Sequence, residues 1–237
     1  MPGIQHSAFS IQHSMNDEGD IFRSLEPRQR AEVERLITYA SYPGGQIFHT
    51  PNEVGQQLFV LRSGRVRVYK LSPEERALTL MMLEPPTIFG EMTLVGQWVH
   101  DTYAEAMVEC VVGVIGRDTL RQVLTRHPQV ALAFMELMGQ RLRAMENKLA
   151  DIAFKSVPQR LASVLLSLSG VAAGQPAGAS PPSAVRYTHQ QLAEMIGSYR
   201  ETVTKAIGEF REAGMIRIED EAISLTDLAQ LQRLANS

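Results

Sequence analysis

The sequence predicts an α+β protein in which a β domain, a long helix and a small helical domain follow one another along 237 residues. Three observations carry this prediction. Short stretches with apolar residues at alternate positions, broken by Gly and Pro, occupy residues 42–115 and are typical of a closed sandwich or roll. An apolar stripe of helical period begins at residue 127. Two shorter helical stripes, joined by Gly197-Ser198, follow nearer the carboxyl end.

These patterns divide the chain into a leader and three regions. The leader, residues 1–20, is polar, lacks a period and repeats Ile-Gln-His-Ser at 4–7 and 11–14, so we expect it to be disordered. Its two histidines have no supporting metal ligands, and Met15 is an alternative start of translation. The regions are a β-roll domain (21–126), a long dimerisation helix (127–154) and a winged helix-turn-helix domain (155–237).

The roll is predicted to begin with one or two short helices and to continue as strands. The helices rest on the apolar positions Phe22, Leu25, Val33, Leu36 and Ile37. Strands are expected at 46–49, 78–83, 88–92 and 104–115, with a strand pair at 58–69 around Ser63-Gly64. Val66 and Val68 of that pair should point inward, because they alternate with arginines.

His127-Pro128 opens the longest helical pattern, with proline at the tolerated first turn. From Met135 onward its apolar residues alternate steps of three and four, which is the seam of a coiled coil. The predicted dimer interface consists of Met138, Leu142, Met145, Leu149 and Ile152. A single amphipathic helix lying on the roll would show a similar stripe, so periodicity alone leaves both arrangements open.

Residues 188–208 read as a helix-turn-helix. Leu192, Ala193 and Ile196 form one apolar stripe, and Val203, Ala206, Ile207 and Phe210 form the second. The glycine between them tolerates the sharp turn. The remaining alternative is an ordinary pair of helices with a charged solvent face.

The exposed face of the second helix suggests DNA as the partner. Glu201, Thr204 and Lys205 lie opposite the packing stripe, and Arg200 flanks them in the first turn. Such donors and acceptors suit base edges in the major groove of double-stranded DNA. The candidate contacts are Gln190, Ser198, Tyr199, Arg200, Glu201, Thr204 and Lys205.

The rest of the domain has the pattern of a winged fold. A hinge is expected at 155–158, a loop at 170–183, and two short strands at 215–219 and 222–225 that form a wing. Thr226-Asp227 should cap a closing helix.

Composition limits the function classes. The net charge is −3, so affinity for DNA must come from a local basic surface. The single cysteine, Cys110, lies in an apolar run and excludes an iron–sulfur cluster held by several thiolates. No apolar run reaches the length of a membrane span and no signal peptide precedes the roll. We therefore expect a cytoplasmic protein with no membrane partner.

Roll, long helix, hinge and winged helix-turn-helix in this order resemble the CRP/FNR family of bacterial transcription regulators over residues 21–225. The most specific matches are Phe89-Gly-Glu91, the Ser63-Gly64-Arg-Val turn, and Ile196-Gly-Ser-Tyr-Arg-Glu-Thr-Val203. The resemblance implies a double-stranded β-helix (jelly-roll, cyclic-nucleotide-binding-like) domain, a homodimer, and activation in contact with RNA polymerase. It also implies an inverted-repeat site with TGTGA-like half-sites, read by Arg200 and Glu201.

The resemblance also places an effector pocket in the roll, and this sequence departs from the cyclic-AMP pattern there. The pocket positions are Gly90, Glu91, Met92, Asp101, Thr102, Arg141 and Met145. Asp101 and Thr102 stand where the cyclic-AMP branch has the Arg-Ser pair that holds the phosphate, and an anion there repels by about 4 kcal/mol at about 4 Å and an effective dielectric near 20. Met145-Glu146 stand where that branch has Thr-Ser. These departures predict a vestigial pocket and no required cofactor, although Arg141 could still contact a phosphate.

Two other functions are compatible with parts of this pattern. One is a sensor of the same architecture, whose DNA binding needs cyclic AMP or another small molecule. The other is a metal-dependent β-barrel enzyme, which needs clustered ligands. The roll's histidines, His49 and His100, are predicted to be far apart, so we expect no metal site and no enzyme activity.

Overall fold

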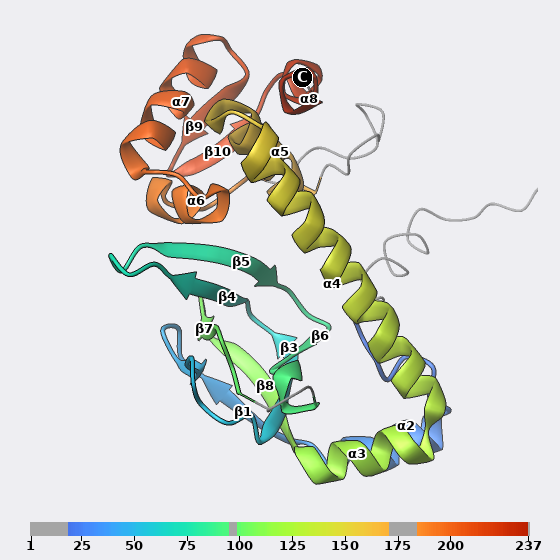
Figure 1. The fold of residues 1–237 in the computed structure, drawn as a ribbon. Helices are drawn as coiled ribbons and strands as arrows, with labels where there is room; N and C mark the ends of the chain where they lie inside the picture. Colours follow the sequence, from blue (N-terminus) through green and yellow to red (C-terminus); the bar gives the residue numbers. More distant parts are fainter. Residues whose placement is uncertain (1–18, 95–98, 171–183, 237) are drawn as a thin grey trace, which may run out of the picture. The chain divides into compact units, whose positions relative to one another are not determined.

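A computed structural model describes residues 19–94, 99–170 and 184–236 and has the predicted α+β architecture (Figure 1). The predicted leader up to residue 18, Met15 and loop residues 171–183 lie outside the described residues. The chain divides into two compact units. The first contains the residues up to Lys70 and Leu80–Ala144, and the second contains Leu71–Thr79 and the residues from Met145 onward.

Two four-stranded sheets make the roll. One has the order β1 (Thr38–Tyr42), β8 (Cys110–Gly116), β3 (Gln57–Ser63) and β6 (Thr87–Phe89). The other has the order β2 (Ile47–His49), β7 (Tyr103–Ala106), β4 (Val66–Leu71) and β5 (Ala77–Leu83). A core of alternating residues from both sheets, including Leu61, Val66, Val68, Ala104 and Val112, is buried between them. The predicted inward position of Val66 and Val68 is confirmed.

Two of the strand predictions are wrong, because strands that are adjacent in the sequence belong to different sheets. Strands β3 and β4 do flank Ser63-Gly64, but β3 pairs with β8 and β6 whereas β4 lies between β7 and β5. The predicted long strand 104–115 is β7 and β8, which belong to different sheets. Met107 donates its N–H to the carbonyl of Arg65 at the crossing (2.8 Å). In both places the chain passes from one sheet to the other, because a roll closes by such crossings.

Helices cover one end of the roll. Of the five positions predicted to be helical, only Val33 lies in helix α2 (Pro27–Glu34). Phe22 and Leu25 are buried in a turn before α2, Leu36 follows the helix and is exposed, and Ile37 is buried just ahead of strand β1. Helix α3 (Arg117–Arg126) was not predicted; its buried Leu120 and Val123 are the signal that could have indicated it. The beginning of α4 (Pro128–Phe154) packs with α2 and α3 against one apolar core.

The winged helix-turn-helix prediction is confirmed in the second unit. Only Lys155 and Ser156 lie between α4 and α5 (Val157–Leu168), so the second half of the predicted hinge 155–158 is helical, and Ser156 opens α5 with a reciprocal capping box to Gln159. Helices α6 (His189–Ile196) and α7 (Arg200–Glu212) follow, then the antiparallel wing β9 (Ile216–Glu219) and β10 (Ala222–Leu225). Helix α8 (Leu228–Asn236) closes the domain, with the Asp227 carboxylate accepting from the Gln230 N–H (2.8 Å).

Helix α4 carries two apolar stripes. Val130, Ala133 and Leu137 are buried in the core of the first unit, and Met138 packs against the same core. Of the other predicted seam residues, Met145 is half-buried and the remaining three are exposed. Leu142, Leu149 and Ile152 are 61%, 69% and 36% exposed in the single chain. Packing on the roll therefore accounts for one stripe and leaves the second stripe open.

Candidate DNA-binding surface and effector pocket

Local sequence determines the geometry of the helix-turn-helix. Thr188 caps α6: its Oγ1 accepts from the Gln191 N–H (3.1 Å), and the Gln191 side chain accepts from the Thr188 N–H (2.9 Å). Gly197 ends the helix in the left-handed region, at φ 63°, where a residue with a Cβ is disfavoured. The Ser198 N–H then donates to the Ala193 carbonyl (2.9 Å). These contacts fix the angle between α6 and α7.

Helix α7 separates a packing face from a solvent face as predicted. Val203, Ala206, Ile207 and Phe210 are buried, whereas Arg200, Glu201, Thr204 and Lys205 are exposed. Arg200 and Glu201 make no side-chain hydrogen bond or ion pair with the other described residues. Lys205 lies 3.9 Å from Glu209 and its side chain is 79% exposed. The helix thus presents two cations and an acceptor to an incoming ligand.

The other predicted contacts border this face. Gln190 is exposed on the first turn of α6 and donates to Glu194 (2.9 Å). Tyr199 is the N-cap residue of α7 and is 59% exposed, whereas Ser198 is half-buried in the turn. His189, which was not predicted, bonds through Nδ1 to the Thr204 hydroxyl (2.9 Å) and so joins α6 to α7. Its position at the first residue of α6 was the available signal.

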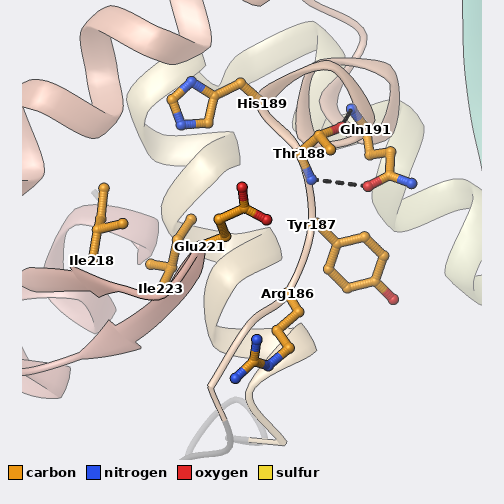
Figure 2. Close-up of a pocket in the computed structure, with 8 residues that line it drawn as sticks. All are labelled: Arg186, Tyr187, Thr188, His189, Gln191, Ile218, Glu221 and Ile223. Carbon is orange, nitrogen blue, oxygen red and sulfur yellow. Dashed lines mark hydrogen bonds between the residues drawn. The ribbon is translucent and has the colours of Figure 1, made fainter.

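A cavity of about 520 Å³ lies beside α6, between its lead-in segment and the wing (Figure 2). It forms because Val185 pairs with Ile223 of β10 through both backbone hydrogen bonds (2.9 Å each). Its lining consists of residues 186–189, Gln191, Ile218, Glu221 and Ile223. Figure 2 shows the Glu221 carboxylate between His189 and the wing. A guanidinium, a carboxylate and an imidazole share this lining, so no single charge sign dominates it.

The effector region is built around the corner after β6. Gly90 has φ 81°, and a Cβ there would lie 2.9 Å from the Phe59 ring, so the Phe-Gly-Glu motif needs its glycine. The chain then forms the 3-10 helix η1 (Glu91–Leu94). Glu91 pairs with Nη1 of Arg141 from α4 at 3.1 Å, with both side chains largely buried. Nη2 of Arg141 donates to the Thr87 hydroxyl (3.2 Å) and to the Ile88 carbonyl.

The remaining predicted pocket positions do not all lie beside the Glu91–Arg141 ion pair. The Asp101 side chain is 64% exposed and forms an ion pair with Lys70 (2.8 Å). Thr102 contributes its carbonyl oxygen, which lies 2.9 Å from Nδ1 of His49. Met92 is half-buried in η1, and Met145 lies further along α4 in the second unit. The structure brings Glu91 and Arg141 together and leaves Asp101 at the surface.

The prediction that His49 and His100 are far apart is wrong. Their rings stack with centroids 3.9 Å apart and planes 9° from parallel, and both side chains are buried. The Asn52 N–H donates to the His100 carbonyl (2.8 Å), and the His100 N–H donates to the Glu53 carbonyl (2.9 Å), so the two segments lie side by side. Burial is the main reason that the pKa of His49 is lowered to about 4, and repulsion from His100 lowers it further. Burial also lowers the pKa of His100. The pair was missed because its partners are distant in sequence.

The described residues contain neither a membrane-spanning helix nor a cluster of metal ligands. Over residues 19–94, 99–170 and 184–236, no helix is long and apolar enough to span a bilayer. Within the same ranges, no three His, Cys, Asp or Glu side chains converge as metal ligands. Cys110 is fully buried, and its thiol donates to the Val108 carbonyl (3.2 Å). Its predicted place in the core is confirmed.

Comparison with known proteins agrees with this geometry. Residues 39–127 match the cyclic nucleotide-binding domain, and residues 159–234 match the Crp-like helix-turn-helix domain. The CRP-like cAMP-activated global transcriptional regulator of Mycobacterium tuberculosis is 30% identical over 219 residues, covering 91% of this chain and 96% of the relative.

Solved structures show the same fold. The c-di-GMP responsive global regulator CLP of Xanthomonas campestris superposes with a TM-score of 0.74 at 20% identity, covering 85% of this chain and 100% of that chain. TTHA1359, a CRP/FNR family regulator of Thermus thermophilus, has a TM-score of 0.66 at 29% identity, covering 84% and 99%. The exposed recognition helix, the β-roll and these similarities together show that the chain belongs to the CRP/FNR family of transcription regulators.

Proposed function

We propose that this regulator binds, as a homodimer, an inverted repeat with TGTGA-like half-sites. The observation that carries the proposal is the exposed face of α7, where Arg200 and Glu201 make no side-chain hydrogen bond or ion pair with the other described residues. An arginine can donate to guanine O6 and N7 in a fork, and a glutamate can accept from cytosine N4. A site selected from random duplexes by the purified protein tests this assignment. Enrichment of a single half-site without its inverted copy would contradict it.

The open stripe of α4 supports the homodimer. Leu142 and Leu149 are separated by one heptad and are more than half exposed in the single chain. Exposed apolar residues aligned along a helix usually mark an interaction surface, and a heptad spacing suits a second copy of the same helix. Two copies would also supply the two recognition helices that an inverted repeat requires.

Control by a ligand is proposed to be weak or absent. Arg141, the cation available for a phosphate, already contacts Glu91, Thr87 and the Ile88 carbonyl from a largely buried position. A phosphate would have to displace a buried carboxylate from its partner, which costs several kcal/mol unless the carboxylate finds another. Asp101 adds no cation to compensate.

The alternative is a regulator that requires cyclic AMP. It is favoured by the match of residues 39–127 to the cyclic nucleotide-binding domain and by the cAMP-activated relative from Mycobacterium tuberculosis. Titration of the selected DNA site with and without cyclic AMP separates the two. We expect affinity to change less than about fivefold, a coupling below about 1 kcal/mol. Tightening by about a hundredfold would establish the alternative.

We further propose that the bound dimer activates transcription in contact with RNA polymerase, which is what membership of the CRP/FNR family implies. Transcription in vitro from a promoter carrying the selected site upstream measures the sign of the effect. A decrease on adding the protein would identify a repressor at that promoter.

A further inference from the structure

We infer that Arg76, at the tip between β4 and β5, is a positioning residue for the recognition helix. It lies in Leu71–Thr79, which groups with the helix-turn-helix in the second compact unit. The inference rests on the proposed role of α7 in reading DNA. Arg76 is argued to act through Tyr199 rather than by touching DNA itself.

The turn holds the backbone of Arg76 in place. The Ser72 N–H donates to the Arg76 carbonyl (2.9 Å), and the Ser72 Oγ accepts from the Arg76 N–H (3.2 Å). The Ser72 hydroxyl donates in turn to the Glu74 carboxylate (2.9 Å). Glu75, which sits at φ 58°, donates its N–H back to the Ser72 carbonyl (2.9 Å). These bonds close the loop and fix the position of the Arg76 backbone.

From this position the guanidinium covers the residue that starts α7. Its central carbon lies 5.0 Å from the centroid of the Tyr199 ring, within the range of a cation–π contact. Tyr199 is the N-cap of α7 and directly precedes Arg200. Glu74, the nearest carboxylate to Arg76, is 4.0 Å away and exposed, so it competes only weakly for the cation.

Two neighbouring contacts fix the same loop to the domain. A Cβ placed on Gly197 would lie 3.3 Å from Cδ1 of Leu78 and 3.9 Å from Cδ1 of Ile152, so Leu78 approaches the turn closely. Lys148 of α4 donates from Nζ to the Thr79 carbonyl, and its burial lowers the pKa of this amine to about 8. The loop therefore meets α4, the turn and the N-cap of α7 together.

This arrangement predicts an effect on DNA reading that a surface charge alone does not have. Tyr199 is 59% exposed, and we expect the Arg76 contact to favour some rotamers of its ring over others. The backbone of Tyr199 sets the first turn of α7, on which Arg200 lies. Without the contact we expect Arg200 to sample more orientations and to lose part of its fit to one base pair.

The test measures binding to the selected site and to random duplex for wild type, Arg76→Ala, Arg76→Lys and a control, Arg28→Ala, an exposed arginine of α2. We expect Arg76→Ala to lose about two- to fivefold on the selected site and nothing on random DNA, the size of an exposed cation–π contact. Arg76→Lys should restore part of the loss, and Arg28→Ala should match wild type. The salt dependence should not change.

A double-mutant cycle tests whether Arg76 affects DNA binding through the Tyr199 ring. In Tyr199→Leu the Arg76→Ala change should have no further effect, whereas in Tyr199→Phe, which keeps the ring, its full effect should remain. An equal loss on random DNA with a salt slope lower by about one would make Arg76 a phosphate contact and overturn the inference. Additive losses in Tyr199→Leu, or no loss at all, would overturn it as well. Wild-type binding to the site tests the proposed function separately.

Discussion

Arg200 and Lys205 are both exposed cations on α7, but their chemistry predicts different roles. Arginine presents a planar fork that matches guanine, whereas lysine is a point charge on a flexible stem. We expect Arg200→Ala to cost roughly 1–3 kcal/mol per half-site, concentrated at one base pair. Lys205→Ala should weaken all sequences evenly and lower the salt slope by about one if its partner is a phosphate. Binding to a series of single base changes at two salt concentrations measures both.

The matched control for these two variants is Arg233→Ala, which removes an exposed arginine from α8. It should leave base preference intact. If Arg200→Ala weakened every site equally and kept the base preference, Arg200 would be a backbone anchor. The assignment of readout to this residue would then be wrong.

The stacked imidazoles predict a dependence of stability on pH. His49 has its pKa lowered to about 4 by burial, which outweighs the nearby carboxylates of Glu53 and Glu91. A histidine with a lowered pKa contributes stability that is complete above its unfolded value of about 6.5 and is lost as pH falls toward 4. We expect urea unfolding to show a loss of about 2–3 kcal/mol between pH of about 7.5 and 4.5 from this group.

Replacing that histidine separates its contribution from those of other groups. His49→Gln cannot take up a proton in this range, so its unfolding free energy should fall less on acidification. His127→Gln, which changes a histidine outside the stacked pair, should follow wild type. An identical acid loss in wild type and His49→Gln would place the proton uptake elsewhere.

At the scale of single elements, two turns require glycine for different reasons. One needs it only for its own backbone conformation, and the other also because a distant strand lies close by. Gly45 and Gly64 both have positive φ, 85° and 91°, but a Cβ on Gly45 meets nothing within 4 Å. On Gly64 it would lie 2.5 Å from the Cys110 sulfur and 2.5 Å from the Glu109 carbonyl oxygen. Gly45→Ala should therefore cost about 1–2 kcal/mol of backbone strain. Gly64→Ala should cost at least about 1–3 kcal/mol more, because β8 must shift. Equal losses in denaturant unfolding would show that the crowding at Gly64 relaxes freely.

The contrast between local and distant contacts also explains which parts of the fold could be predicted from the sequence. The helix-turn-helix was readable because its cap, glycine and apolar stripes lie within about twenty residues and act locally. Strand alternation correctly placed Val66 and Val68 inside, but alternation does not say which strand is a neighbour. The crossings at Gly64 and near Met107 depend on pairings distant in sequence, and so does the contact of His49 with His100.

The two candidate sites differ in the same way. The DNA-binding surface depends on local sequence, whereas the effector region depends on contacts between residues distant in sequence. The positions on α7 could be predicted from a single helical period. In the effector region, the sequence indicated that Arg141 could contact a phosphate, but the structure pairs it with Glu91. That pairing joins α4 to the corner after β6, and no local pattern encodes it.

At the scale of the whole molecule, the exposed apolar stripe of α4 (Leu142, Leu149 and Ile152) predicts that two chains form a dimer. Leu142→Asp combined with Leu149→Asp would place carboxylates in a helix–helix seam, where each costs several kcal/mol unless it protonates. We expect the double variant to sediment as a monomer and wild type as a dimer. The matched control, Val54→Asp with Val108→Asp, changes two exposed valines of the roll and should remain dimeric. A dimer mass for the α4 variant would exclude this seam.

A dimer with two recognition helices also fixes how its half-sites must be spaced. Two copies of α7 that read successive major-groove faces lie about 34 Å apart, which is one turn of roughly ten base pairs. Inserting about five base pairs between the half-sites rotates one of them to the opposite face of the duplex. We expect affinity then to fall to that of a single half-site. Inserting about ten restores the face but lengthens the separation by about 34 Å, and binding should remain weak because the seam holds the two helices at a set distance.

Gel-shift titration of these three duplexes measures the effect, with Leu142→Asp, Leu149→Asp protein as the comparison. Wild type should distinguish the spacings, because both half-sites contribute binding energy only when they are engaged together. The monomeric variant should bind all three duplexes equally and weakly. Equal affinity of wild type for all three would mean that each recognition helix binds alone, and the inverted-repeat assignment would have to be abandoned. A preference for the five-pair insertion would instead point to helices held on opposite faces.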